Sequence, residues 1–388
     1  MVRLSDLVGD TEEFLTERLG KKALFRGGAV AEPGEIASVG DIDRVITGSV
    51  LRTPGIRVVK GGNVVPPDRY TSPSTYGYAG LGDVIDPAKV VQHYRGGATL
   101  VLGTVNLLLP RLNELCKNVE MDLGHPVDAN VYVAPPDAQA FDVHCDAQDI
   151  IVIQVHGDKN WTLFDDIVAD PGGGKVVPDG KGASSSYELR TGDVLYVPRG
   201  MPHLVRTATS ASIHVTISVN TLTWADLLKD VVAGVLRSDE YAAPLPMGAG
   251  LAERIEPLVK RYADRLAADV TAAATADSVH RTIYRRPAYG EGHQAGLLRS
   301  ALIGGDAPSD RIVLRPGTWP LITTGADTCL IEAGGRRYRV PAAVARACSL
   351  LGYGPMSVAD LSADPEEAAE IAATLIGLGL AEQAGSRS

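Results

Sequence analysis

The chain has 388 residues, 45% of them hydrophobic, and this length favours two or three domains because a single core rarely grows beyond about 250 residues. Its formal net charge of −10 and pI near 5.3 argue against a partner that is held by overall attraction to phosphates, such as nucleic acid. We also find no secretory signal, no apolar run long enough to cross a membrane and no paired cysteine spacing, so we expect a cytoplasmic protein.

The first third of the chain is predicted to mix helices with strands. Apolar spacing predicts a helix over residues 11–19, and the Gly- and Ala-rich stretch that follows predicts short helices and loops. Gly61 and Gly62 stand between two apolar runs, which is typical of a hairpin. We then expect a helix over 86–93, a strand over 98–105, and a helix over 110–123 that begins at a proline.

Residues 130–220 break into short β-type runs separated by turn residues. These runs are ANVYVAP, DIIVIQVHG, NWTLFDD, YELRTGDVLYVPRG and SASIHVTISVN, and such a succession predicts a barrel or sandwich. Residues 171–186, PGGGKVVPDGKGASSS, stand between the runs NWTLFDD and YELRTGDVLYVPRG. Their density of Gly, Ser and Pro predicts a mobile loop with no strand.

The remainder of the chain has a different character. Residues 224–298 carry apolar residues at helical spacing, and residues 299–388 combine short strands with two helices in an order that resembles a winged-helix module. We therefore expect three parts, with boundaries at 1–223, 224–298 and 299–388.

The strongest chemical signal is the pair His144 and Asp146. Side chains at positions i and i+2 of a strand point to one face, so an imidazole and a carboxylate are presented together. A third ligand is offered by His203, which follows a turn and a strand in GDVLYVPRGMPH. Two histidines and one carboxylate leave adjacent coordination positions open, as non-haem iron(II) oxygenases require, whereas catalytic zinc more often has other ligand sets.

An isolated His-x-Asp pair is more often a surface histidine beside a turn aspartate. Here the pair leads directly into the apolar run DIIVIQV, and the later GDVLYVPRGMPH follows in order. This context favours the metal site.

The motifs together resemble those of the JmjC-type ribosomal oxygenases and their bacterial cupin-like relatives. The resemblance is carried by DPAKVVQHYRGGATLVL, by NVYVAPPDAQAFDVHCDAQDIIVIQVHGDKNWTLFDD, and by GDVLYVPRGMPHLV with SIHVTISVN. It implies a β-rich double-stranded β-helix (a cupin/JmjC barrel), a helical dimerisation region and a C-terminal winged-helix-like domain. It also implies a homodimer that uses iron(II) and 2-oxoglutarate to hydroxylate side chains of proteins or peptides.

The resemblance also places the co-substrate 2-oxoglutarate. It implies that Asn130, Tyr132 and Lys159 hold this molecule, and a buried ammonium beside a phenol suits a carboxylate. The alternatives are that Tyr132 belongs to the core and that Lys159 is a solvated hairpin residue. His214, on the polar face of its strand, is interpreted as a pocket residue or a core histidine, and Cys145 replaces the aromatic that family members often carry between the ligands.

Two other functions stay open at this point. The first is a metal-binding cupin sensor whose winged helix contacts DNA or protein, although the last helix has three glutamates and no basic residue to meet phosphates. The second is a zinc or manganese cupin that uses no O2. The sequence leaves the substrate open among a ribosomal protein, a natural-product precursor peptide and a free amino-acid derivative.

Overall fold

The structure is a computed structural model, and it forms two compact units, Met1–Thr221 and Leu222–Ser388. The residues it describes are 2–76, 79–169, 174–175, 184–245, 251–275 and 310–384, the last range without 316, 317, 319, 326, 327, 334, 335 and 353.

Short helices begin the first unit. The predicted helix over 11–19 is confirmed as α2 (Thr11–Glu13) followed by one π-helical turn (Phe14–Arg18). The sequence did not predict α3 (Val39–Gly48), whose first turn is capped by the hydroxyl of Ser38, which accepts a hydrogen bond from the Asp41 N–H at 3.0 Å. The other helical segments of this unit are α1 (Leu4–Val8), α4 (Pro87–Arg95), α5 (Pro110–Leu123) and the 3-10 turns Pro33–Glu35, Pro67–Arg69 and Val105–Leu107.

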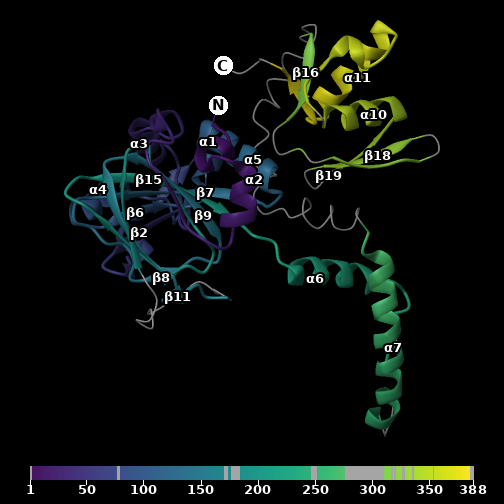
Figure 1. The fold of residues 1–388 in the computed structure, drawn as a ribbon, viewed down its shortest axis with the longest axis horizontal. Helices are drawn as coiled ribbons and strands as arrows, with labels where there is room; N and C mark the ends of the chain where they lie inside the picture. The colour runs from purple at the N-terminus through teal and green to yellow at the C-terminus, as the bar shows by residue number, and fades with distance from the viewer. Residues whose placement is uncertain are drawn as a thin grey trace. The chain divides into compact units, whose positions relative to one another are not determined.

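An eight-stranded antiparallel sheet forms the larger layer of this unit. In spatial order its strands are β1 (Leu24–Arg26), β13 (Val194–Val197), β9 (Asp149–His156), β15 (Ser212–Val219), β7 (Val127–Ala134), β6 (Thr99–Leu102), β2 (Ile56–Lys60) and β3 (Asn63–Val64). One face packs against the helices of the unit, and α1, α2 and α5 can be seen beside β7 and β9 in Figure 1. The predicted glycine hairpin joins β2 to β3, with positive φ angles of 55° at Gly61 and 76° at Gly62.

A five-stranded sheet forms the smaller layer. Its order is β11 (Gly174–Lys175), β8 (His144–Cys145), β14 (His203–Thr207), β10 (Asp158–Phe164) and β12 (Ser184–Arg190). From β7 to β15 the chain passes back and forth between the two sheets, which confirms the expected double-stranded β-helix. Inward-facing apolar side chains from both sheets form one core, made of Ile150, Val152, Leu195 and Val197 from the large sheet with Trp161, Leu163 and Leu189 from the small one.

The prediction that residues 171–186 contain no strand is wrong in two places. Gly174–Lys175 pairs antiparallel with Cys145 and His144, and Ser184–Ser186 belong to β12. Residues of this composition have a low intrinsic preference for strands, but backbone hydrogen bonds to a neighbouring strand can override that preference. The rest of the predicted loop, 171–173 and 176–183, lies outside the described residues. A further hairpin joins β4 (Ser74–Tyr76) to β5 (Ala79–Leu81).

The second unit begins with α6 (Trp224–Val235) and α7 (Leu251–Ala273), as the helical spacing predicted. Its C-terminal part contains two three-stranded sheets and two helices around one core. Their bounds are β16 (Arg311–Leu314), β17 (Leu321–Thr323), β18 (Cys329–Ala333), β19 (Arg336–Val340), α10 (Ala342–Leu351), β20 (Met356–Ser357), a 3-10 turn (Val358–Asp360), α11 (Pro365–Gly377) and β21 (Ala381–Gln383).

The winged-helix assignment and the division into three domains stay predictions. The helical periodicity read at 276–298 lies outside the described residues. Within the described part of the chain, no helix combines the length and the apolar character that crossing a membrane requires.

Candidate metal centre and its neighbouring lysine

Three predicted ligands come together on the small sheet. His144 and His203 are paired across β8 and β14, and Asp146 follows β8. One ligand atom from each residue lies within 4.8 Å of the others, and His203 Nε2 is 3.7 Å from Asp146 Oδ2. We call these three residues the triad. Among the described residues, they are the one group of three or more ionisable side chains whose geometry could hold a metal ion.

Backbone carbonyls determine which ring nitrogens of the triad are free. His144 Nδ1 lies 2.8 Å from the Asp142 carbonyl oxygen, and His203 Nδ1 lies 3.0 Å from the Met201 carbonyl oxygen. A carbonyl only accepts hydrogen bonds, so each Nδ1 must carry a proton, and Nε2 is the nitrogen of each ring that is left to bind a metal. Both imidazoles are thus oriented for binding through Nε2, in the way that outer hydrogen bonds orient metal-binding histidines.

Burial also favours the neutral form of His203. This side chain is 2% exposed, and burial lowers its pKa, with a further lowering from the neighbouring His144 and an opposing effect from Asp146. A neutral imidazole is the form that binds metal.

A distant hairpin supports the segment that carries His144. The Gly62 N–H donates to the Ala140 carbonyl at 2.9 Å, and a Cβ added to Gly62 would lie 3.0 Å from Asp142 Oδ2. The same Asp142 supplies the carbonyl that orients His144. The β2–β3 turn therefore fits closely against the backbone that positions a ligand.

Lys159 is buried beside three aromatic rings. It is 4% exposed, its Nζ lies 3.2 Å from His214 Nδ1, and burial lowers its pKa to about 7. His214 stacks on Tyr132 with ring centroids 4.6 Å apart and an interplanar angle of 6°. We call Lys159, His214, Tyr132 and Trp161 the Lys159 cluster. The alternative that Lys159 is a solvated hairpin residue is wrong.

Trp161 connects the Lys159 cluster to the triad. Its ring centroid is 5.6 Å from that of His203 and 5.7 Å from that of His214. Trp161 was not among the residues predicted from the sequence. Its position two residues after Lys159 on one strand was the available signal, because both side chains must then share a face.

Asn130 is held in place by the turn after β6. Its Oδ1 accepts a hydrogen bond from the Thr104 N–H at 3.0 Å, and its Nδ2 faces Ser218 Oγ at 3.5 Å. Thr104 has a φ of 50°, which is uncommon for a threonine. Asn130 and Tyr132 keep intermediate exposure although β7 is an interior strand, so solvent reaches this face of the sheet.

Cys145 is not brought to the triad. It is 2% exposed, and strand alternation points it away from the face of His144. Burial raises the pKa of its thiol, with a smaller contribution from Asp146, so the thiol stays protonated and unreactive.

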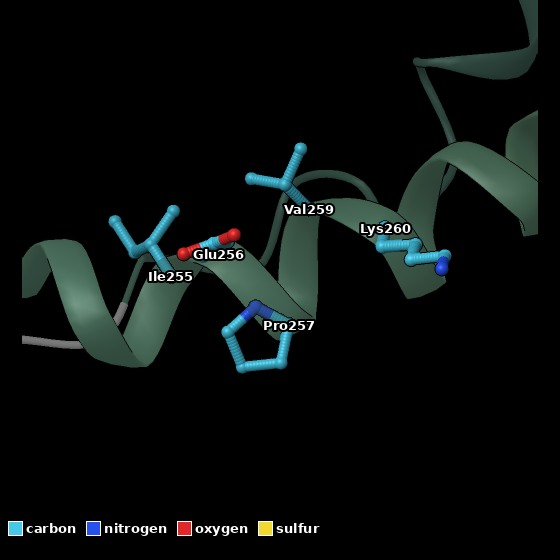
Figure 2. A pocket seen from close by; sticks show the side chains of 5 residues that line it. All are labelled: Ile255, Glu256, Pro257, Val259 and Lys260. Atoms are coloured by element: carbon cyan, nitrogen blue, oxygen red, sulfur yellow. The ribbon is translucent and has the colours of Figure 1, made fainter.

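A shallow depression on α7 carries no comparable chemistry. It is lined by Ile255, Glu256, Pro257, Val259 and Lys260, all from one stretch of helix (Figure 2). The depression lies on the surface of α7 at the point where Pro257 interrupts the helix.

Comparison with known proteins agrees with this geometry. The JmjC domain family matches residues 107–227, which include the triad and the whole Lys159 cluster. The bifunctional lysine-specific demethylase and histidyl-hydroxylase NO66 of Drosophila willistoni is 34% identical over 160 residues, 39% of this chain and 21% of that protein. Ribosomal oxygenase 2 of Bos taurus is 28% identical over 210 residues, 50% of this chain and 45% of that protein. This chain thus spans less than half the length of either relative.

Solved structures show the same fold along nearly the whole chain. The ribosomal oxygenase YcfD from Escherichia coli, in complex with cobalt and 2-oxoglutarate, covers 98% of this chain with a TM-score of 0.55 at 15% sequence identity. A second structure of YcfD gives a TM-score of 0.56 with the same coverage and identity. The likeness therefore extends from the barrel through the second unit.

Proposed function

Since the chain carries a JmjC domain, we propose that it is an iron(II)- and 2-oxoglutarate-dependent oxygenase that hydroxylates a side chain of a protein or peptide substrate. One observation carries the proposal. A triad of two imidazoles and a carboxylate stands near a buried lysine that has no carboxylate partner among the described residues.

The donor set of the triad fits iron(II). Both Nε2 lone pairs and one carboxylate oxygen converge, and two histidines with one carboxylate leave positions free for further ligands. When bound, iron(II) and 2-oxoglutarate supply the oxidising chemistry, in which one atom of O2 enters the product hydroxyl and the other enters succinate as CO2 leaves.

The Lys159 cluster fits the distal carboxylate of 2-oxoglutarate. The ammonium of Lys159 supplies the counter-charge, and the phenol of Tyr132, on β7 of the large sheet, supplies a neutral donor, because burial raises its pKa. Asn130, fixed by Thr104, presents its amide N–H groups toward the same face. The role of these residues is to bind and orient the co-substrate between Lys159 and the triad.

Trp161 supports that arrangement from the small sheet. It is 3% exposed and packs with Leu163 and Leu189 in the inner core. Such a wall limits the access of water from the side of the small sheet, and a lower water content strengthens each charge-assisted hydrogen bond there.

The substrate class follows the relatives. NO66 is named as a histidyl-hydroxylase and demethylase, and the bovine relative and YcfD as ribosomal oxygenases. A side chain of a ribosomal protein is therefore the first substrate to test, with a natural-product precursor peptide as the second.

The helices after the barrel support a homodimer. On α6, Trp224 is 79% exposed and Leu228 is 48% exposed, and Val259 of α7 is 58% exposed. Exposed apolar side chains on a helix pair need a partner, and a second copy of the chain supplies an identical pair. Sedimentation of the full chain, with Trp224→Glu beside it, would show a dimer that the variant converts to monomer. The C-terminal module, whose Arg337 is paired with Glu332, is proposed as a winged-helix-like surface for protein contacts.

Anaerobic titration tests the proposed function. Iron(II) and then 2-oxoglutarate are added to the full chain, and the weak visible charge-transfer band of the chelate is recorded. We expect the band in the wild type, its loss in His144→Ala and a much weaker 2-oxoglutarate affinity in Lys159→Met.

Two exposed residues of the barrel strands serve as matched controls. His156→Ala removes an exposed histidine at the end of β9, and Asn160→Ala removes an exposed side chain next to Lys159. Both should keep the band. A wild-type protein that binds iron(II) but shows no band would contradict the proposal and favour a cupin sensor or a different metalloenzyme.

A further inference from the structure

The carboxylate of Asp149 is buried close to the triad in the chain but is not one of its ligands. Asp149 begins β9, just after the turn that carries the ligand Asp146, and it is 2% exposed. Strand alternation places it on the same face of β9 as Ile151, which packs in the helix-covered core outside the barrel. A buried carboxylate is costly unless hydrogen bonds satisfy it. The partners of Asp149 therefore indicate what this group does.

One oxygen of Asp149 binds the segment that leads to the ligand His203. Asp149 Oδ1 accepts a hydrogen bond from the Tyr196 hydroxyl at 2.5 Å and another from the Arg199 N–H at 3.1 Å. Tyr196 lies on β13, and Arg199 lies in the turn that follows this strand. Burial raises the pKa of Tyr196, and the charge of Asp149 adds to the effect, so the phenol keeps its proton and acts as a donor.

The turn after β13 connects this contact to two ligands of the triad. The Met201 N–H donates to the Pro198 carbonyl at 3.1 Å, and Gly200 has a φ of 77°, as in a type II turn. The Gly200 N–H donates to the backbone carbonyl of Asp146 at 2.9 Å. Met201 supplies the carbonyl that orients the ring of His203. A displacement of this turn would therefore move both ligands.

The other oxygen of Asp149 binds a segment that carries no ligand. Asp149 Oδ2 accepts a hydrogen bond from the Thr221 hydroxyl at 2.9 Å. Thr221 follows β15 and is the last residue of the first unit, and no member of the triad lies on that strand. The two oxygens of one carboxylate can therefore be tested separately.

We propose that Asp149 is a positioning residue for the metal centre, whose Oδ1 fixes the turn before His203 relative to Asp146. It acts through Tyr196 and the backbone of Arg199, and it is not itself a ligand. Ligands that are already held in place lose less conformational freedom when a metal binds, so the metal is bound more tightly. This inference rests on the proposed function, because it takes the triad to be a metal site.

The test measures cobalt(II) binding to the full-length apoprotein by calorimetry and by the visible d–d absorption of the bound ion. For Asp149→Ala, which removes all three hydrogen bonds, we expect the dissociation constant of cobalt(II) to rise about tenfold to a hundredfold. At saturating cobalt(II) its d–d band should also change in shape, because the ligands are no longer held in one geometry. Asp149→Asn should stay within about threefold of wild type, since its amide oxygen can accept both Oδ1 bonds while its amide NH2 donates to the Thr221 hydroxyl.

A matched pair of variants covers the case in which Asp149→Ala does not fold. Tyr196→Phe removes a hydrogen bond to Oδ1 and Thr221→Val removes the one to Oδ2, so both should lower the thermal midpoint of the apoprotein. We expect Tyr196→Phe to raise the dissociation constant of cobalt(II) by about threefold to tenfold. Thr221→Val should keep the wild-type value, because its bond does not reach a segment that carries a ligand.

The results separate positioning from stability and from charge. Wild-type cobalt(II) affinity in Asp149→Ala, or equal affinity in Tyr196→Phe and Thr221→Val, would overturn the positioning role and leave the proposed function standing. Asp149→Asn losing as much affinity as Asp149→Ala would overturn it too, because the charge of Asp149 and not its geometry would then matter. If the wild-type protein does not bind cobalt(II), the metal centre of the proposed function fails, and the inference fails with it.

Discussion

Replacing Lys159 with methionine should stabilise the unliganded protein, and the gain should depend on pH. Burial lowers the pKa of Lys159 from its ordinary 10.5 to about 7. At 1.36 kcal/mol for each pKa unit, keeping this lysine protonated in the folded state costs on the order of 5 kcal/mol. Methionine has a similar length and no charge, so Lys159→Met removes that cost.

The sign of the pH dependence follows from proton binding. Below about pH 7 the lysine is protonated in both the folded and unfolded states, and the full cost is present. Between about pH 7 and pH 10.5 the unfolded lysine keeps its proton and the folded one has lost it, so wild-type stability rises with pH. The advantage of Lys159→Met should therefore be largest near pH 7 and shrink by about 1.4 kcal/mol for each pH unit above that.

Equilibrium unfolding in guanidinium chloride at pH 7, 8 and 9 measures this difference. Trp161 lies in the first unit next to the substitution, so its fluorescence reports the relevant transition. Other ionisable groups occur in both proteins and cancel in the comparison. Lys22→Met removes the same charge from an exposed site and should show a gap near zero at every pH.

A gap that does not change between pH 7 and pH 9 would refute this reasoning, because it would mean that Lys159 titrates at the same pH in the folded and unfolded states. A Lys159→Met variant that is less stable than wild type at pH 7 would refute it as well. Either result would show that burying the Lys159 ammonium does not carry the cost inferred from its pKa.

Three further predictions concern the same unit. The affinity for 2-oxoglutarate should fall as pH rises above about 7, because the neutral Lys159 of the unliganded protein must first take up a proton, and calorimetry in buffers of different ionisation enthalpy should detect that proton. Tyr196→Phe should lower the free energy of unfolding by about 2 kcal/mol, since the phenol donates to Asp149 Oδ1 at 2.5 Å and accepts from the Gly20 N–H at 2.7 Å. A loss below about 0.5 kcal/mol in chemical denaturation would contradict this prediction. Gly62→Ala should weaken cobalt(II) binding, because the added Cβ would press on Asp142. Gly61→Ala is the control: it has a similar positive φ and open space around the added Cβ, so it should be strained by about 1 kcal/mol without loss of metal affinity. Equal metal affinity in the two variants would exclude a positioning role for the turn.

Local spacing accounts for the parts of the fold that the sequence predicted well. The Gly61–Gly62 turn and the proline at the start of α5 are determined by backbone preferences of a few neighbouring residues. The strand β11 and the helix α3 were missed for the opposite reason. β11 forms because it pairs with β8. α3 is stabilised because its side chains Ile42, Val45 and Ile46 pack into a core that other segments of the chain form.

The sequence alone predicted the chemistry of the centre. His144 and Asp146 must share a face in any strand, the context of His203 marked it as the third ligand, and the resemblance of these motifs to JmjC oxygenases pointed to Lys159, Tyr132 and Asn130.

Only the tertiary structure decided what surrounds those residues. Strand register and long-range turns set the carbonyls of Asp142 and Met201 that orient the two histidine rings. They also set the tryptophan that lies between the triad and Lys159. Register is a property of two strands together, and a shift of one residue would reverse every side chain, so no spacing within one segment could have placed them.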